Sequence, residues 1–228
     1  MARGIFVTGT DTGVGKTVVA AALLRGLVAE GFRAAGMKPV AAGLDAGDAV
    51  PPDTRALIAA GNVDAPLADA NPYAFAPPIA PELAARAAGV IIDLDVIAGA
   101  YSRLAARADA VVVEGAGGAL VPLSRATDML DIAAHLRLPV LLVVGMRLGC
   151  INHALMTALA VRARGLTIAG WVANRIDRDM LESDANVSAL TERLGAPLCA
   201  DFAWNDGAAY APAFPRAAVR ALGFALPR

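Results

Sequence analysis

The sequence predicts an α/β fold in which one doubly wound, mostly parallel sheet is covered by helices on both faces. Short apolar runs alternate with longer Ala- and Leu-rich segments, and a glycine-rich turn joins the first run to the first long helix. The 228 residues are 57% hydrophobic and 18% charged, a balance that excludes intrinsic disorder. Because a domain averages about 150 residues, we expect residues 1–228 to form a single domain.

Six segments are candidates for the strands of this sheet. Each is short, is rich in β-branched or aliphatic residues, and is followed by a stretch in which a covering helix can form. The candidate strands are residues 4–8, 33–38, 110–114, 140–145, 168–174 and 198–202.

Two helices are predicted from the spacing of apolar residues. Residues 16–30 and 152–164 place apolar side chains three and four positions apart, and each segment ends near a glycine, Gly31 or Gly165. Residues 42–53 and 62–82 are rich in Gly, Pro, Asp and Asn, so we expect long loops there, at one edge of the sheet. Long loops on a rigid scaffold often carry function.

Charge and cysteine content exclude several classes of protein. Twenty Lys and Arg against 21 Asp and Glu give a formal charge of -1, so no overall positive field attracts nucleic acid or anionic lipid. The apolar run at 138–146 is far shorter than the roughly 20 residues of a membrane span, and the first apolar segment is too short for a secretory signal. Cys150 and Cys199 form no metal-binding motif. We therefore expect a cytoplasmic protein with reduced cysteines and no nucleic-acid or membrane partner.

The strongest functional signal is the sequence Thr-Gly-Thr-Asp-Thr-Gly-Val-Gly-Lys-Thr at residues 8–17, between the first strand and the first helix. Gly13 and Gly15 allow successive backbone N–H groups to face inward, where the positive end of the helix dipole also attracts phosphate. Lys16 can reach the β- and γ-phosphates, and the Thr17 hydroxyl can bind Mg²⁺. The usual pattern has glycine at the position of Thr10. The segment predicts a P-loop NTPase-like nucleotide site, the alternative being a glycine-rich helix cap with an incidental lysine.

Polar residues that end other strands should meet this loop, because ligands of open parallel sheets bind beyond the carboxyl ends of the strands. Lys38 ends the second strand and could stabilise transferring negative charge, or it could be an exposed strand-end lysine. Glu114 ends the third strand and could anchor Mg²⁺, or it could form a structural salt bridge. Residues 115–118, Gly-Ala-Gly-Gly, offer backbone donors to an anion, or form a tight turn.

Other polar residues have an ordinary structural interpretation beside the functional one. Asp53 could cap a helix or supply a second carboxylate to the metal. Asn174 could pair with a purine or form a turn. A capped amphipathic helix accounts for Asp128, Asp131 and His135, and packing accounts for His153. Neither histidine has the Ser or Cys partner of a hydrolytic triad.

Taken together, the motifs resemble those of dethiobiotin synthetase, the ATP-dependent enzyme that closes the ureido ring in biotin synthesis. The resemblance covers most of the chain, and within it Thr10-Asp11-Thr12 is a family trait. The motifs, in family order, are Gly9-Thr-Asp-Thr-Gly-Val-Gly-Lys-Thr17, Met37-Lys-Pro-Val40, Asn71-Pro-Tyr-Ala-Phe75, Val113-Glu-Gly-Ala-Gly-Gly118, Leu148-Gly-Cys-Ile-Asn-His153 and Gly170-Trp-Val-Ala-Asn174.

The resemblance implies a role for each candidate residue. Lys16 and Thr12 would act on the transferring phosphate, and Lys38 would bind the substrate carbamate. Thr17, Asp53 and Glu114 would hold Mg²⁺. Asn174 would read adenine, and further contacts to the nucleotide would come from Gly13, Val14, Gly15, Val18, Gly115, Ala116, Gly117, Arg175, Ala203, Trp204 and Asn205.

The resemblance also implies the substrates and the assembly. A carbamate formed from 7,8-diaminononanoate and CO₂ would be phosphorylated by ATP, and ring closure would then release phosphate. The family is a homodimer, and the residues implied in substrate binding are Ala42 and Gly118, with Gly149, Cys150 and Asn152 holding the carboxylate end of the substrate across the subunit interface.

Three positions depart from the family pattern. Ala42 stands where serine is common, which removes one hydroxyl contact to the substrate. Ala203 precedes Trp204 where proline is usual, which leaves the preference for a nucleotide base open. Glu82 stands where histidine is expected, and nothing in the sequence explains this change.

The main alternative is a nucleotide-switch ATPase of the partitioning or septum-positioning kind, which shares the fold and acts by binding partners. Those proteins usually carry a lysine early in the phosphate loop, where this sequence has Asp11 and Thr12. Two further alternatives are a synthetase domain acting on a corrin precursor and a nucleotide-binding scaffold without activity.

Overall fold

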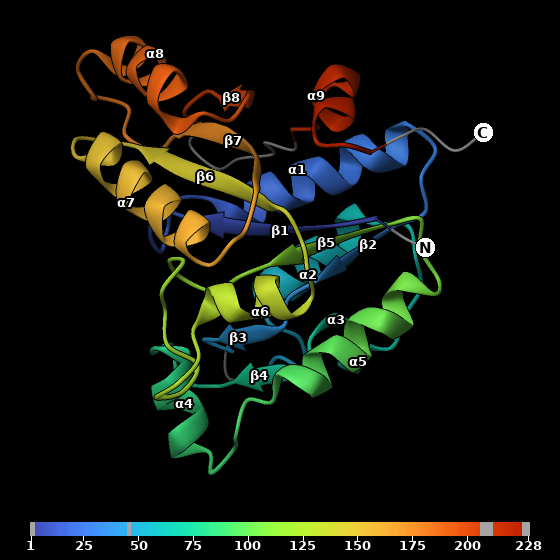
Figure 1. The fold of residues 1–228 in the computed structure, drawn as a ribbon. Helices are drawn as coiled ribbons and strands as arrows, with labels where there is room; N and C mark the ends of the chain where they lie inside the picture. The colour runs from blue at the N-terminus through green and yellow to red at the C-terminus, as the bar shows by residue number, and fades with distance from the viewer. Residues whose placement is uncertain (1–2, 45–46, 206–211, 225–228) are drawn as a thin grey trace.

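The computed structural model describes residues 3–44, 47–205 and 212–224, and its main sheet has six parallel strands in the order β2-β5-β1-β6-β7-β8 (Figure 1). Parallel strands with intervening helices confirm the predicted fold class, and each predicted strand lies within one residue of the observed one at both ends. The strands are β1 Arg3–Gly9, β2 Ala34–Met37, β5 Ala110–Glu114, β6 Val140–Met146, β7 Ile168–Arg175 and β8 Leu198–Phe202.

The sheet is buried on both faces, which is why its strands are apolar throughout. Phe6 of the central strand β1 packs into one hydrophobic cluster, while Ile5 and Val7 pack into the other. One face is covered by α1 (Lys16–Ala29), α2 (Pro52–Ala60) and α9 (Arg216–Ala221). The opposite cluster receives side chains of α4 (Pro81–Ala87), α5 (Leu94–Ala105), α6 (Met129–His135), α7 (Cys150–Ala163) and α8 (Ser183–Leu194).

Both predicted long helices are present, and glycines end them as expected. Gly31 and Gly165 have positive φ angles of 85° and 69° just after α1 and α7. The helix α7 begins at Cys150, two residues before the predicted start, because Gly149 at φ 95° is its N-cap. Gly149 has no side chain that could cap the helix, so the sequence does not mark this start as a Ser, Thr, Asp or Asn would.

The two predicted long loops are only partly loops. Residues 62–82 contain α3 (Leu67–Ala70), β4 (Tyr73–Phe75) and the start of α4, and β4 pairs in parallel with β3 (Val40–Ala42). Strands of three residues are too short to show a period, which explains why this second sheet was not predicted. The Asn71 amide donates to the Lys38 carbonyl at 2.7 Å, so this folded segment fixes the backbone at the end of β2.

The helix predicted around Asp128 is α6, and it begins with a capping box. The Asp128 carboxylate accepts the Leu130 N–H at 2.9 Å, while Asp131 accepts the Asp128 N–H at 2.7 Å. Arg164, at the end of α7, donates to both carboxylates and joins the two helices. Within the described ranges, no helix is long and apolar enough to cross a membrane.

Candidate active site

The phosphate loop is built as the motif predicts. Residues 10–15 follow β1, and Gly13 and Gly15 take positive φ angles of 75° and 89° before α1 begins at Lys16. The Asn174 amide donates to the Val14 carbonyl at 2.8 Å, and a Cβ at Gly15 would lie 2.1 Å from that amide nitrogen. Glycine is therefore required at residue 15 by both backbone conformation and space.

The two lysines of the sequence, Lys16 and Lys38, both lie in this region and are 6% and 3% exposed. The Lys16 ammonium donates to the Asp11 carbonyl at 2.8 Å, across the phosphate loop. Burial, followed by repulsion from Lys38, lowers the pKa of Lys16 to about 8. The negative charge of a phosphate group in the loop would offset both effects by stabilising the ammonium form.

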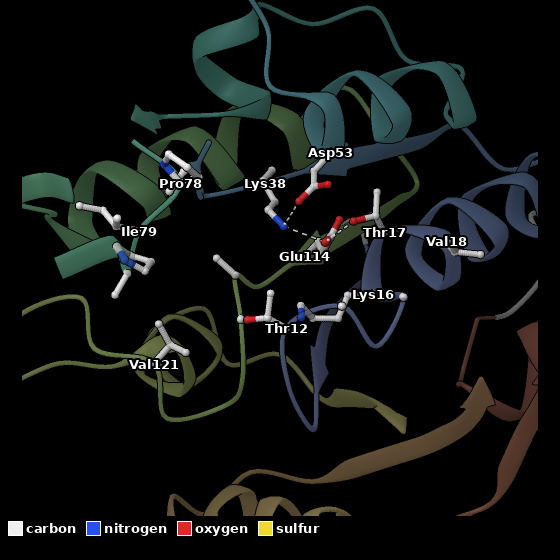
Figure 2. A pocket seen from close by; sticks show the side chains of 17 residues that line it. Thr12, Lys16, Thr17, Val18, Lys38, Asp53, Pro78, Ile79, Glu114 and Val121 are labelled. Atoms are coloured by element: carbon white, nitrogen blue, oxygen red, sulfur yellow. Dashed lines mark hydrogen bonds and ion pairs between the residues drawn. The ribbon is translucent and has the colours of Figure 1, made fainter. Parts of the chain in front are cut away.

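Lys38 lies between two carboxylates (Figure 2). Its ammonium is 2.8 Å from Asp53 Oδ2, 2.7 Å from Glu114 Oε1 and 3.2 Å from the Gly115 carbonyl, so its three N–H groups each have an acceptor. Burial alone would lower the pKa of Lys38, but Glu114 and Asp53 outweigh it and raise that pKa. Lys38 is thus a buried ammonium ion and not an exposed strand-end lysine.

The carboxylates also meet the Thr17 hydroxyl, which donates to Glu114 Oε1 at 2.8 Å. Asp53 is not a helix cap, because Pro51 takes the N-cap position and Asp53 in the first turn of α2 points to Lys38. Burial would raise the pKa of Asp53, but Lys38 and then the Thr17 hydroxyl lower it overall. Asp53 is therefore an anion facing the phosphate loop.

The donor set fits a hard divalent cation such as Mg²⁺, which prefers oxygen ligands. Thr17 supplies a hydroxyl, Asp53 and Glu114 supply carboxylates, and the buried Glu114 Oε2 has no hydrogen-bond partner. No cluster of three or more His, Cys, Asp or Glu side chains occurs in the described part of the chain. A metal here would therefore depend on a hydroxyl, two carboxylates and oxygen atoms from its substrate.

These groups line a cavity of about 710 Å³ with one polar and one apolar side. Most of the predicted phosphate and metal residues line it, together with Ala42. The lining residues are Thr12, Gly13, Gly15, Lys16, Thr17, Val18, Lys38, Ala42, Asp53, Pro78, Ile79, Ala80, Pro81, Glu114, Ala116, Gly117 and Val121.

Sequence reasoning missed the apolar side of the cavity. Pro78, Ile79, Ala80, Pro81 and Val121 line it, and they belong to segments predicted as loop or left unassigned. Their proline and aliphatic content was visible, but nothing local shows that a loop turns toward a nucleotide site. The folded β3–β4 sheet and α4 bring residues 78–81 to the cavity, where Figure 2 shows Pro78 and Ile79 on the side away from Thr17 and Asp53.

A second cavity, of about 450 Å³, lies on the other side of the phosphate loop. Gly118 lines it with Thr10, Asp11 and His153. The predicted substrate residue Gly118 and the nucleotide residues therefore lie on two cavities that share Thr12 and Val121. Gly149, Cys150 and Asn152 are at the start of α7 and do not line either cavity as described.

The residues predicted to face the base lie around the ends of β7 and β8. The buried Asn174 holds the phosphate loop through Val14, which is a contact within the protein rather than to a ligand. Arg175 donates to Asp201 and Asp184 at 2.7 and 2.6 Å, and Asp201 first, then Asp184, raises its pKa. Residues 203–205 follow β8.

Within that segment, Trp204 is 40% exposed, and the Arg178 guanidinium lies 5.3 Å from the centre of its ring. Ala203, Trp204 and Asn205 are not among the described residues that line either cavity.

Three comparisons place the chain among known proteins. A family model with the description "AAA domain" matches residues 3–209. The chain is 56% identical over 198 residues to a protein of Nitrosospira multiformis, covering 87% of each chain, and 47% identical over 228 residues to one of Xanthomonas euvesicatoria, covering 98% of this chain and 97% of the relative. Both relatives are named ATP-dependent dethiobiotin synthetase BioD.

Among solved structures, the fold is similar to the MinD cell division protein of Aquifex aeolicus, with a TM-score of 0.56 at 16% identity, over 90% of this chain and 84% of that one. It is also similar to a ParA family ATPase from Chlorobium tepidum, with a TM-score of 0.53 at 12% identity, over 90% and 86%. At such identities the likeness concerns the fold alone.

Proposed function

The chain belongs to the ATP-dependent dethiobiotin synthetase family and is an ATP-dependent ligase; from this premise we propose which of its residues carry the reaction. The observation that supports the assignment most directly is the meeting of Lys16, Thr17, Lys38, Asp53 and Glu114 at one cavity. Two cations, two carboxylates and a hydroxyl at the amino end of a helix are the groups that phosphoryl transfer needs. The partitioning and septum-positioning alternative rests on fold similarity only.

ATP would bind with its phosphates over the amino end of α1. The N–H groups of residues 13–17 would donate to the phosphate oxygens, and Lys16 would leave the Asp11 carbonyl to contact the γ-phosphate. The Thr12 hydroxyl, on the same cavity wall, would contact the transferring group. Thr17, Asp53 and Glu114 would hold Mg²⁺, which when bound neutralises charge on the phosphates.

Lys38 is the group we assign to the carbamate. One amine of 7,8-diaminononanoate would add to CO₂ and lose a proton, giving a carbamate anion that the Lys38 ammonium holds against the phosphate loop. A carbamate oxygen would then attack the γ-phosphorus in line, and ADP would leave. Attack by the second amine on the activated carbonyl carbon would form the second C–N bond of the ureido ring and expel phosphate.

This chemistry needs no side-chain nucleophile, since both attacking groups belong to the substrate. The protein positions the reactants and stabilises negative charge. Ala42 lines the same cavity but has no hydroxyl, so the contact to the carbamate is assigned to Lys38.

We further propose that the chain acts as a cytoplasmic homodimer in which Gly149, Cys150 and Asn152 serve the substrate of the partner subunit. They are not among the described residues that line either of the two cavities at the phosphate loop, which supports a role toward a second subunit. Gly118 would contact the same substrate from the second cavity.

The assignment is tested by measuring phosphate release from ATP and Mg²⁺, with and without 7,8-diaminononanoate and bicarbonate, and by identifying the cyclic urea by mass. Release should depend on the diamine. The Lys16→Ala variant should lose on the order of a hundredfold in turnover, because it removes a charge used in the transition state. Release that ignores the diamine, or near-normal turnover in this variant, would contradict the proposal.

A further inference from the structure

The phosphate loop carries a negative charge of its own. Asp11 lies two residues before Gly13, and its Oδ1 accepts the Thr12 N–H at 2.7 Å, while its carbonyl accepts the Lys16 ammonium at 2.8 Å. A carboxylate in a loop that must receive a triphosphate repels that ligand unless another charge offsets it. A phosphate loop that contains Asp11 therefore needs a nearby cation.

The offsetting charge comes from a distant part of the sequence. Arg147 lies in the turn between β6 and α7, and its Nη2 donates to Asp11 Oδ2 at 2.6 Å. The strands β1 and β6 are neighbours in the sheet, so the turn after β6 lies beside the loop after β1 (Figure 1). Both side chains are about half exposed, at 42% and 48%.

The two oxygens of Asp11 therefore have different partners. One accepts the Thr12 N–H and the other accepts from Arg147, and Asp11 lines the second cavity, not the one that Lys16 and Thr17 line. The Thr12 N–H, then Arg147, lower the pKa of Asp11 against the opposing effect of burial, which keeps it an anion in the neutral range. With Arg147 removed, the Asp11 carboxylate would lose the only cation that it contacts directly in the described part of the chain, and the more distant charges of Lys16 and His153 would remain.

We propose that Arg147 is a positioning residue for nucleotide binding, which neutralises Asp11 and holds the phosphate loop with Thr12 and Lys16 turned to the triphosphate. The inference rests on the proposed ATP site and adds a residue to it. It also ties the phosphate loop to the turn that carries Gly149 and Cys150, because Arg147 accepts the Cys150 N–H at its carbonyl at 3.0 Å.

The test is a double-mutant cycle on ATP affinity, measured by calorimetry at low and high salt. Arg147→Met should weaken ATP binding about tenfold at low salt, as expected for one uncompensated charge near a triphosphate, and less at high salt. Arg147→Lys keeps the charge and should stay within about threefold of the wild type. Asp11→Asn should bind ATP at least as well as the wild type, because the amide oxygen can still accept the Thr12 N–H.

The decisive variant combines the two changes. If neutralisation is the role of Arg147, Asp11→Asn in the Arg147→Met background should restore most of the lost affinity. A double variant as weak as Arg147→Met alone, or an Arg147→Met variant with unchanged affinity at low salt, would overturn the inference. A wild-type chain that binds no ATP would instead overturn the proposed function.

The ion pair between Arg33 and Asp109 is a matched control. It has a similar N–O distance of 2.8 Å and is also exposed, but it lies where β2 and β5 begin, at the opposite end of the sheet from the phosphate loop. Arg33→Met should leave ATP affinity unchanged. Thermal unfolding of each variant separates a loss of affinity from a loss of folded protein, and the Arg147 variants should unfold close to the wild type because exposed pairs contribute little to stability.

Discussion

Replacing Lys38 by methionine tests the buried charge cluster that underlies the site. Lys38 and Glu114 are 3% and 1% exposed and are 2.7 Å apart, so methionine would leave the Glu114 carboxylate buried without its counter-ion. Breaking a buried pair in this way costs about 3–5 kcal/mol of the free energy of unfolding. Asp53 adds little to this cost, because its side chain is 48% exposed and water can solvate it.

The double variant Lys38→Met, Glu114→Gln separates the loss of a charge partner from the loss of packing. Glutamine keeps an oxygen for the Thr17 hydroxyl, which donates to Glu114 at 2.8 Å, but carries no charge. We expect it to recover at least about half of the stability lost by Lys38→Met. Both variants should be inactive in cyclic urea formation.

Urea unfolding followed by circular dichroism gives the free energies for these variants. Arg33→Met, which breaks a pair whose side chains are 63% and 34% exposed, is the control and should cost less than about 1 kcal/mol. The reasoning is refuted if Lys38→Met is as stable as the wild type, or if the double variant is no more stable than Lys38→Met.

Three further predictions concern the phosphate loop and the helix α6. Because the pKa of Lys16 is about 8, its ammonium loses its proton above that pH, and ATP affinity should fall up to about tenfold per pH unit from pH 8 to 10. Calorimetry in two buffers should then detect the uptake of a proton on ATP binding. An ATP affinity that stays constant from pH 8 to 10 would contradict the role given to the Lys16 ammonium. Gly15→Ala should weaken ATP binding by about tenfold or more, since the new Cβ would lie 2.1 Å from the Asn174 amide nitrogen. Gly31→Ala, at a similar φ but in open space, should leave ATP binding unchanged, and equal effects of the two variants would refute the steric argument. Asp128→Ala should cost about 0.5–2 kcal/mol in urea unfolding by removing the capping box of α6, with ATP affinity unchanged, and a stable variant would show that the cap contributes little.

The main sheet could be predicted because its strands are buried on both faces. The run Ala110-Val111-Val112-Val113 is fully buried, and such a run needs no knowledge of its neighbours to be recognised. The strands β3 and β4 could not be predicted, because three residues carry no period and their pairing joins Val40 to Tyr73 across a long separation.

In the candidate site too, residues within one motif could be predicted, and residues that depend on distant contacts could not. Lys16 and Thr17 are contiguous with the phosphate loop, so one motif predicts both. Asp53 was ambiguous in sequence, since a carboxylate after two prolines also suits a helix cap, and only the contact with Lys38 distinguishes the two interpretations. Arg147 gave no signal at all, because its partner Asp11 is 136 positions away.

The near absence of lysine makes the cavity chemically addressable. Apart from the amino terminus, Lys16 and Lys38 are the only primary amines of the 228 residues, and both lie in the same cavity. An amine-acylating reagent used at mildly alkaline pH would thus label this cavity in preference to the eighteen arginine side chains elsewhere, which such reagents spare. Lys16, with its lowered pKa, would react before the doubly paired Lys38, so the protection of Lys16, measured at that residue apart from the amino terminus, would show how much of the enzyme has nucleotide bound.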